Sequence, residues 1–96
     1  MKIITILEGQ VSSEKWGVLE KEYLRVVNEK AGIMPIGSFL VQRKDNPEMW
    51  RVISIWGSAE ELAKMRQSGE TPAGVLVFRA AGSEPVLSIF EVKSEL

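Results

Sequence analysis

The hydrophobic periodicity of this chain alternates between the spacing of strands and the spacing of helices, in an order that few folds share. Strand-like stretches occupy residues 2–8, 36–42, 49–56 and 86–93, and helix-like stretches occupy residues 13–31, 59–68 and 71–82. A polar turn over residues 44–48 joins the middle two strands as a hairpin. This order predicts a ferredoxin-like α+β fold, βαββαβ, with a four-stranded antiparallel sheet. We expect residues 1–96 to form a single domain.

Capping residues mark where the helices should begin. Ser12 precedes the first helical stretch and is the expected N-cap. Ser58 and Glu61 have the spacing of a capping box, in which each side chain bonds the other residue's backbone N–H. Thr71 is the expected N-cap of the last helix, with Pro72 as its first helical residue. These signals agree with the periodicity and support the same order of elements.

Two absent residue types limit the chemistry. The chain has no cysteine and no histidine, which excludes disulfides, thiolate–zinc sites, thiol nucleophiles and imidazole catalysis. Twelve Lys and Arg against thirteen Asp and Glu give a net charge of −1, which argues against nucleic acid or an anionic membrane as partner. We find no transmembrane segment and no signal peptide, so the expected location is cytoplasmic. Carboxylates, Lys, Arg, hydroxyls and aromatic rings remain for function.

The predicted third strand is apolar on both faces. One face carries Trp50, Val52, Ser54 and Trp56, and the other carries Met49, Arg51, Ile53 and Ile55. The helices of a ferredoxin-like fold cover only one face of the sheet, so something else must cover the second. We expect a second copy of the chain, giving a homodimer through the sheet face, although scattered exposed apolar residues are the simpler alternative. The sequence leaves open which face meets the partner.

The chain resembles the antibiotic biosynthesis monooxygenase-like family of the dimeric α+β barrel superfamily. The resemblance rests on Trp50, Val52, Trp56 and Ser58, on the following AEELAKMRQSGETPAG, and on FRAAGSEPVLSIFEV near the end. It covers nearly the whole chain. It implies a homodimeric barrel in which two sheets face each other, with a small pocket between sheet and helices in each subunit. Members oxidise aromatic polyketides with O₂ and without metal or flavin, degrade haem, or act on quinols, and others have no known activity.

The chain departs from the pattern of the haem-degrading branch. That branch uses an Asn on the first strand, a Trp, and a His on the following helix. Trp56 matches the Trp, but Thr5 lies near the Asn position, and Met65 or Arg66 near the His position. We therefore do not expect haem degradation. The ring-oxidising members place an Asn, a Trp, a Tyr and an Arg around the substrate, and Trp56 again matches the Trp.

Four residues are the candidate catalytic groups. Trp56 is a platform for a flat ligand, or alternatively packs the strand against the next helix. Tyr23 is a hydrogen-bond partner for a ligand oxygen, or bonds a backbone carbonyl. Arg51 or Arg79 is the charge stabiliser. Alternatively, Arg51 is exposed at an edge or paired across the dimer, and Arg79 complements the dipole at a helix C-terminus. Four further aromatic side chains are candidate ligand-binding residues, or else belong to the core or the dimer interface: Phe39, Trp50, Phe78 and Phe90.

Together these features support one leading functional hypothesis and one alternative. The leading hypothesis is a cofactor-independent oxygenase that acts on an electron-rich aromatic such as a quinol or anthrone, with no metal and no cofactor. The substrate phenolate would donate an electron to O₂ in an apolar pocket. The alternative is a non-catalytic dimeric module of the same fold that binds a ligand or another protein.

Overall fold

The computed structural model describes residues 1–30 and 32–96. Its elements follow the expected order, with a short 3-10 turn, Ser13–Lys15, before the first helix. The strands are β1 (Ile3–Gln10), β2 (Gly37–Gln42), β3 (Met49–Trp56) and β4 (Val86–Glu91), and the helices are α1 (Trp16–Glu29), α2 (Ala59–Gln67) and α3 (Ala73–Ala80). The four-stranded antiparallel ferredoxin-like fold predicted from the sequence is confirmed.

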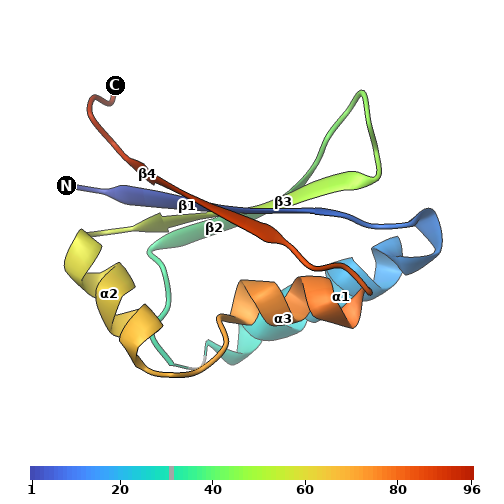
Figure 1. Cartoon of the computed structure of the whole chain (residues 1–96), viewed down its shortest axis with the longest axis horizontal. Helices are drawn as coiled ribbons and strands as arrows, with labels where there is room; N and C mark the ends of the chain where they lie inside the picture. The colour runs from blue at the N-terminus through green and yellow to red at the C-terminus, as the bar shows by residue number, and fades with distance from the viewer. Residues whose placement is uncertain (31) are drawn as a thin grey trace.

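The strands form one sheet in the order β2-β3-β1-β4, with every neighbouring pair antiparallel. The three helices lie on one side of this sheet, and the other side carries no helix (Figure 1). We call the side that faces the helices the inner face and the opposite side the outer face. In β3 the inner face carries Trp50, Val52, Ser54 and Trp56, which are all buried. This assignment decides between the two faces that the sequence left open.

Most predicted boundaries hold within two residues, and two capping predictions need correction. Ser58 accepts a hydrogen bond from the Glu61 backbone N–H, so the capping box is confirmed on that side. Ser12 makes no side-chain cap, because the chain first forms the 3-10 turn. Pro72, with ψ of 139°, is itself the extended residue before α3, so Thr71 is not the cap. The predicted end of the first helix at Ala31 lies outside the described residues.

The core divides into two clusters along the inner face. The larger packs α1 and α3 against the middle of the sheet and includes Leu19, Trp50, Val52, Val77 and Phe78. The smaller packs α2 against the end of β3 and contains Ile3, Trp56 and Leu62. The side chains between the two clusters leave space unfilled, and the candidate site lies there.

The outer face is apolar across all four strands. Ile4 on β1 pairs with Ile55 on β3 and with Phe90 on β4, and Ile6 pairs with Ile53 in the next row. We give the name outer patch to the following apolar side chains of this face: Ile4, Ile6, Phe39, Val41, Ile53, Ile55, Val86 and Phe90. Phe39 is 55% exposed and Phe90 is 52% exposed. The single chain therefore leaves a continuous apolar surface on this side.

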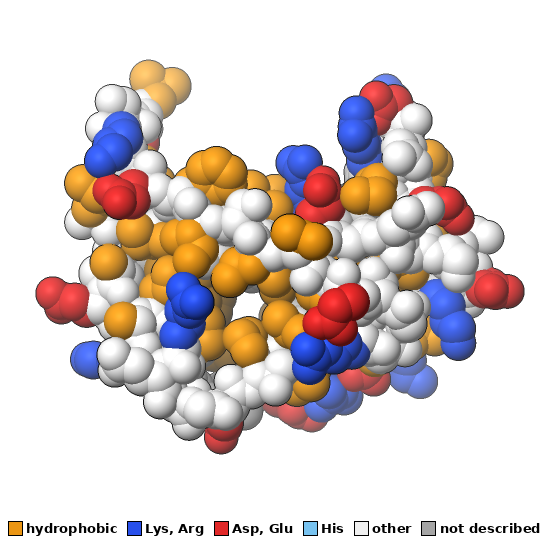
Figure 2. Space-filling model, in the orientation of Figure 1, with side chains coloured by type: hydrophobic (Ala, Val, Ile, Leu, Met, Phe, Trp, Pro, Cys, Tyr) orange, Lys and Arg blue, Asp and Glu red, His pale blue; other side chains and the backbone are white. Residues whose placement is uncertain are grey.

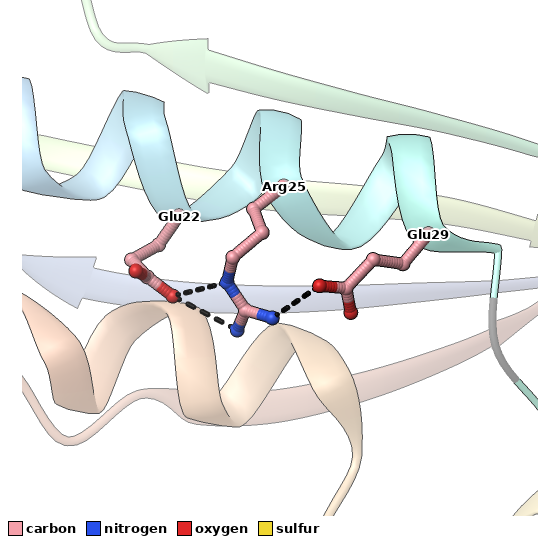
Figure 3. A network of polar contacts seen from close by, with 3 residues as sticks. All are labelled: Glu22, Arg25 and Glu29. Carbon is pink, nitrogen blue, oxygen red and sulfur yellow. Dashed lines mark hydrogen bonds and ion pairs between the residues drawn. The ribbon is translucent and has the colours of Figure 1, made fainter.

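The solvent side of α1 is held by an ion-pair network (Figure 3). The Arg25 guanidinium lies between Glu22 and Glu29 and donates to both carboxylates, at 3.0 Å and 2.9 Å. Because these residues are three and four positions apart, they share one helix face. Hydrogen bonds with Glu22 and then Glu29 raise the pKa of Arg25. This face of α1 is polar and solvated, which orients its apolar face toward the sheet.

Gly9 allows α3 to approach β1 closely. A Cβ at this position would lie 2.7 Å from Ser83 Oγ and 2.8 Å from Phe78 Cδ1. Phe78 is fully buried and cannot move aside, so Gly9→Ala is expected to lower the free energy of unfolding by about 1–3 kcal/mol. Gly17→Ala is the matched control, because its Cβ meets nothing within 4 Å and alanine favours the helix by about 0.5–1 kcal/mol. Urea denaturation of both variants measures the difference, and equal effects would contradict this account.

Candidate functional site

A cavity of about 350 Å³ lies between the inner face of the sheet and the three helices. Its volume is at the lower end of the range for small-molecule sites. The walls are mostly apolar and come from α1, α2, α3 and the segment before β2, through Val26, Val27, Met34, Leu62, Met65 and Val77. Figure 2 shows it as a hollow beneath the sheet, surrounded by hydrophobic side chains. The cavity separates the two core clusters.

The wall of the cavity formed by the sheet, which we call its floor, carries a row of hydroxyl groups. Thr5 on β1 pairs with Ser54 on β3, and Ser54 pairs with Ser38 on β2, so the three residues lie side by side across the sheet. All three line the cavity. Thr5 and Ser54 are buried, at 8% and 9% exposure. We call these residues the hydroxyl row, and each hydroxyl can both donate and accept a hydrogen bond.

The two aromatic site residues that the sequence put forward both bond to this row. Trp56 Nε1 donates to Thr5 Oγ1 at 3.0 Å, from a ring that is 4% exposed. The Tyr23 hydroxyl donates to Ser38 Oγ at 3.0 Å, and Ser38 Oγ lies 3.4 Å from Ser54 Oγ. The Trp56 N–H is therefore held by the protein itself. Tyr23 bonds a side chain, whereas the simpler alternative expected a backbone carbonyl.

Three charged side chains line the same cavity: Arg66 on α2, Arg79 on α3 and Glu84 after α3. Arg79 donates to Glu84 through Nε and an Nη atom, at 2.9 Å and 2.8 Å. This hydrogen bonding lowers the pKa of Glu84, so the carboxylate stays ionised beside Arg79 at neutral pH. Both side chains are largely exposed, so solvent screens the pair. Glu84 is the sole carboxylate that lines the cavity within residues 1–30 and 32–96.

The structure brings three of the predicted site residues together and separates the others from them. Trp56, Tyr23 and Arg79 line the cavity. Arg51 lies on the outer face, where it pairs with Glu8 at 2.7 Å, so it is not available to this cavity. The remaining aromatic candidates also lie elsewhere: Phe78 and Trp50 in the larger core cluster, and Phe39 and Phe90 on the outer patch. Phe39 and Trp50 also line a second, more open groove beside β2. Within the described residues, none of these four lines the cavity that contains the hydroxyl row.

Sequence reasoning missed Ser38, Ser54 and Arg66 as site residues. The available signal for Ser54 was a single polar residue at an inward position of an otherwise apolar strand. Ser54 stands in this way between Val52 and Trp56. The assembly of Ser38 and Ser54 into a row depends on the register between strands, which the sequence of one strand does not contain.

Comparison with solved structures finds close likenesses of fold. A conserved protein from Methanosarcina mazei Go1 matches with a TM-score of 0.74 and 17% identity, over 97% of this chain and 94% of that one. SnoaB, a cofactor-independent oxygenase from Streptomyces nogalater, matches in a mutant form with a TM-score of 0.72 and 13% identity, over 99% and 96%. The chain has the fold of the antibiotic biosynthesis monooxygenase-like proteins. The resemblance seen in the sequence is thereby confirmed at the level of structure.

A candidate antibiotic biosynthesis monooxygenase from Caulobacter crescentus shares the same fold, with a TM-score of 0.71 and 19% identity over 97% of this chain and 91% of that one. No family model matches the sequence, and no curated protein does. None of the helices in the described residues has the length and apolar character needed to cross a membrane. The described part of the chain also contains no group of three or more Asp or Glu side chains placed to hold a metal ion.

Proposed function

We propose that this protein is a small-molecule oxygenase of the cofactor-independent type, acting on an electron-rich aromatic such as a quinol or anthrone. The observation that carries the proposal is the cavity itself, in which Trp56, Tyr23 and the hydroxyl row meet within apolar walls. A flat ring fits between apolar walls, and buried hydroxyls favour a ligand that brings its own oxygen atoms. SnoaB, a cofactor-independent oxygenase, has the same fold.

The proposed reaction depends mainly on the substrate. Its phenolate donates an electron to O₂, and the protein supplies a water-poor pocket that orients the ring. Ser38 and Ser54 bind a ring oxygen, and the Tyr23 hydroxyl fixes the position of Ser38. Trp56 is held in place by Thr5 and presents its ring as a platform. The chain has no histidine to accept the proton of the substrate's hydroxyl group. That proton is lost to water when the phenolate forms.

One observation favours a second candidate, a non-catalytic binding module. The carboxylate that lines the cavity, Glu84, is engaged by Arg79, so the described residues offer the cavity no free carboxylate as a base. Such a module binds aromatic ligands through the same cavity without turnover. Oxygen uptake distinguishes the two candidates, since only the oxygenase consumes O₂ with the ligand that it binds.

The same proposal includes a homodimer formed through the outer patch. The patch spans four strands without a helix over it, and it is nearly free of charge except for the paired Arg51 and Glu8. In a two-fold dimer the same surface of both subunits forms the interface, so the outer patch of one subunit would contact the outer patch of the other. Burial of Phe39 and Phe90 against a second subunit removes large rings from water.

The expected result of an activity test is O₂ consumption with at least one quinol or anthrone, measured with an oxygen electrode. A fluorescence titration first identifies the ligand, through saturable quenching of tryptophan emission. Trp56→Phe and Tyr23→Phe are expected to lower turnover by about 10²-fold or more if these groups orient the ring.

Trp16→Phe is the matched control for this test. Trp16 Nε1 also donates one hydrogen bond, to the Val11 carbonyl at 2.8 Å, but the ring lies outside the cavity. This variant is expected to keep turnover while losing a similar bond. Saturable binding with no O₂ consumption by any ligand would favour the binding module, and equal losses in Trp16→Phe and Trp56→Phe would remove Trp56 from the site.

A further inference from the structure

One cation of the cavity has no carboxylate partner. Among the described residues no Asp or Glu lies within ion-pair distance of Arg66, whereas Arg79 is bonded twice by Glu84. The three charged groups that line the cavity are Arg66, Arg79 and Glu84, which sum to +1. The positive charge that remains for a ligand is therefore on α2.

Arg66 reaches the cavity because of its position along α2. Met65 and Arg66 follow Leu62 by three and four residues, so both lie on the helix face of Leu62, and all three side chains line the cavity. Figure 2 shows basic side chains at the edge of the hollow. Arg66 is an exposed residue, and it lines the cavity together with the apolar side chains of Leu62 and Met65. The hydroxyl row and Arg66 both line this cavity.

A favourable interaction with the helix dipole explains a cation in the last turn of α2, but not its contact with the cavity. Lys64 lies in the same last turn and also has a positive charge, yet it does not line the cavity. The dipole acts on both residues alike. Among the described residues that line the cavity, Arg66 is the cation without a carboxylate partner. A guanidinium can bind a carboxylate through two parallel hydrogen bonds.

We infer that the cavity selects an aromatic ligand with an anionic oxygen, and that Arg66 is the residue that binds this oxygen. The inference rests on the proposed function, because it concerns the same cavity. The hydroxyl row binds neutral ring oxygens at the floor, and Arg66 binds the carboxylate or ionised ring hydroxyl at the rim. Arg66 thereby sets which end of the ligand enters first.

Binding of matched charged and neutral probes tests the inference without any turnover. The first pair is anthraquinone carboxylate and its uncharged hydroxymethyl analogue, and the second is a hydroxynaphthoquinone ionised at neutral pH and its methyl ether. The wild-type protein is expected to bind the anionic member of at least one pair about tenfold more tightly. The pair that shows this preference tells whether Arg66 takes a carboxylate or an ionised ring hydroxyl. The preference should decline as salt is added, because the guanidinium is exposed.

Substitutions assign the preference to one residue. Arg66→Gln is expected to abolish it while leaving the neutral probes unchanged, and Arg66→Lys is expected to retain part of it. Lys64→Gln, which removes the same charge from the same helix turn, should change nothing. Circular dichroism checks that each variant is folded.

Any of the following outcomes would overturn the inference. Equal affinity for both members of each pair, or a preference that survives Arg66→Gln, would overturn it and leave the proposed function intact. A preference lost in Arg79→Gln and kept in Arg66→Gln would assign the anion to Arg79 instead. Failure of every probe to bind would overturn the proposed function, and this inference with it.

Discussion

Replacement of Phe78 with alanine is expected to lower the free energy of unfolding by about 3–5 kcal/mol. The Phe78 ring is fully buried where α3 meets β1, and it belongs to the larger core cluster with Val52 and Leu19. Its removal loses the transfer energy of the ring and leaves a cavity that rigid neighbours cannot fill. A single small domain has a total stability of about 5–15 kcal/mol, so this loss is a large part of it.

Leu76→Ala is the control for this prediction. Leu76 lies on the same helix but is 48% exposed, so its loss is expected to cost well under half as much. Urea unfolding at one fixed protein concentration measures both variants, because self-association would otherwise add to the apparent stability. If Phe78→Ala cost no more than Leu76→Ala, the α3–β1 contact would not be the centre of the core.

The second large effect concerns two neighbouring residues on opposite faces of β3. Ile53→Glu on the outer patch is expected to give a folded monomer, because a carboxylate there prevents two apolar patches from meeting. Val52→Glu is expected to prevent folding, since Val52 is 4% exposed and an unpaired charge buried at that point costs several kcal/mol. A glutamate at position 53 thus tests dimer formation, and a glutamate at position 52 tests folding.

Light scattering after size exclusion, at micromolar protein, measures the assembly state. Val18→Glu on α1 is the control, because it replaces an exposed apolar residue with the same carboxylate away from the outer patch. That variant is expected to remain dimeric. A wild-type chain that is monomeric under these conditions would contradict the homodimer. Circular dichroism distinguishes a folded monomer of Ile53→Glu from an unfolded chain.

The order of helices and strands could be predicted from the sequence, because the spacing of hydrophobic residues changes between a strand and a helix within a few neighbouring residues. The strand at residues 49–56 appears with the bounds expected, and Ser58 begins the second helix as expected. The error at Pro72 also has a local reason. Its φ of −53° suits a helix, but its ψ of 139° is extended, and proline fixes only the first of these angles.

The candidate site was less predictable because it depends on which face of the sheet the helices cover. Trp56 and Arg51 are on opposite faces of β3, and both faces are mostly apolar, so alternation alone could not choose between them. The structure places Trp56 beside the cavity and Arg51 outside. Arg66 was overlooked because a cation in a last helical turn is ordinary, and only its neighbours in space distinguish it from Lys64.

The pairing of Thr5 with Ser54 has a consequence for how this chain can change in length. Because side chains alternate between faces, deletion of one residue within β1 would point Thr5 outward and bring Ile4 or Ile6 over the cavity floor. The pocket would lose the Thr5 hydroxyl and with it the partner of the Trp56 N–H, and the outer patch would gain that hydroxyl. Insertions and deletions are therefore expected to be tolerated in the turn between β2 and β3, which does not line the cavity, but not within the strands.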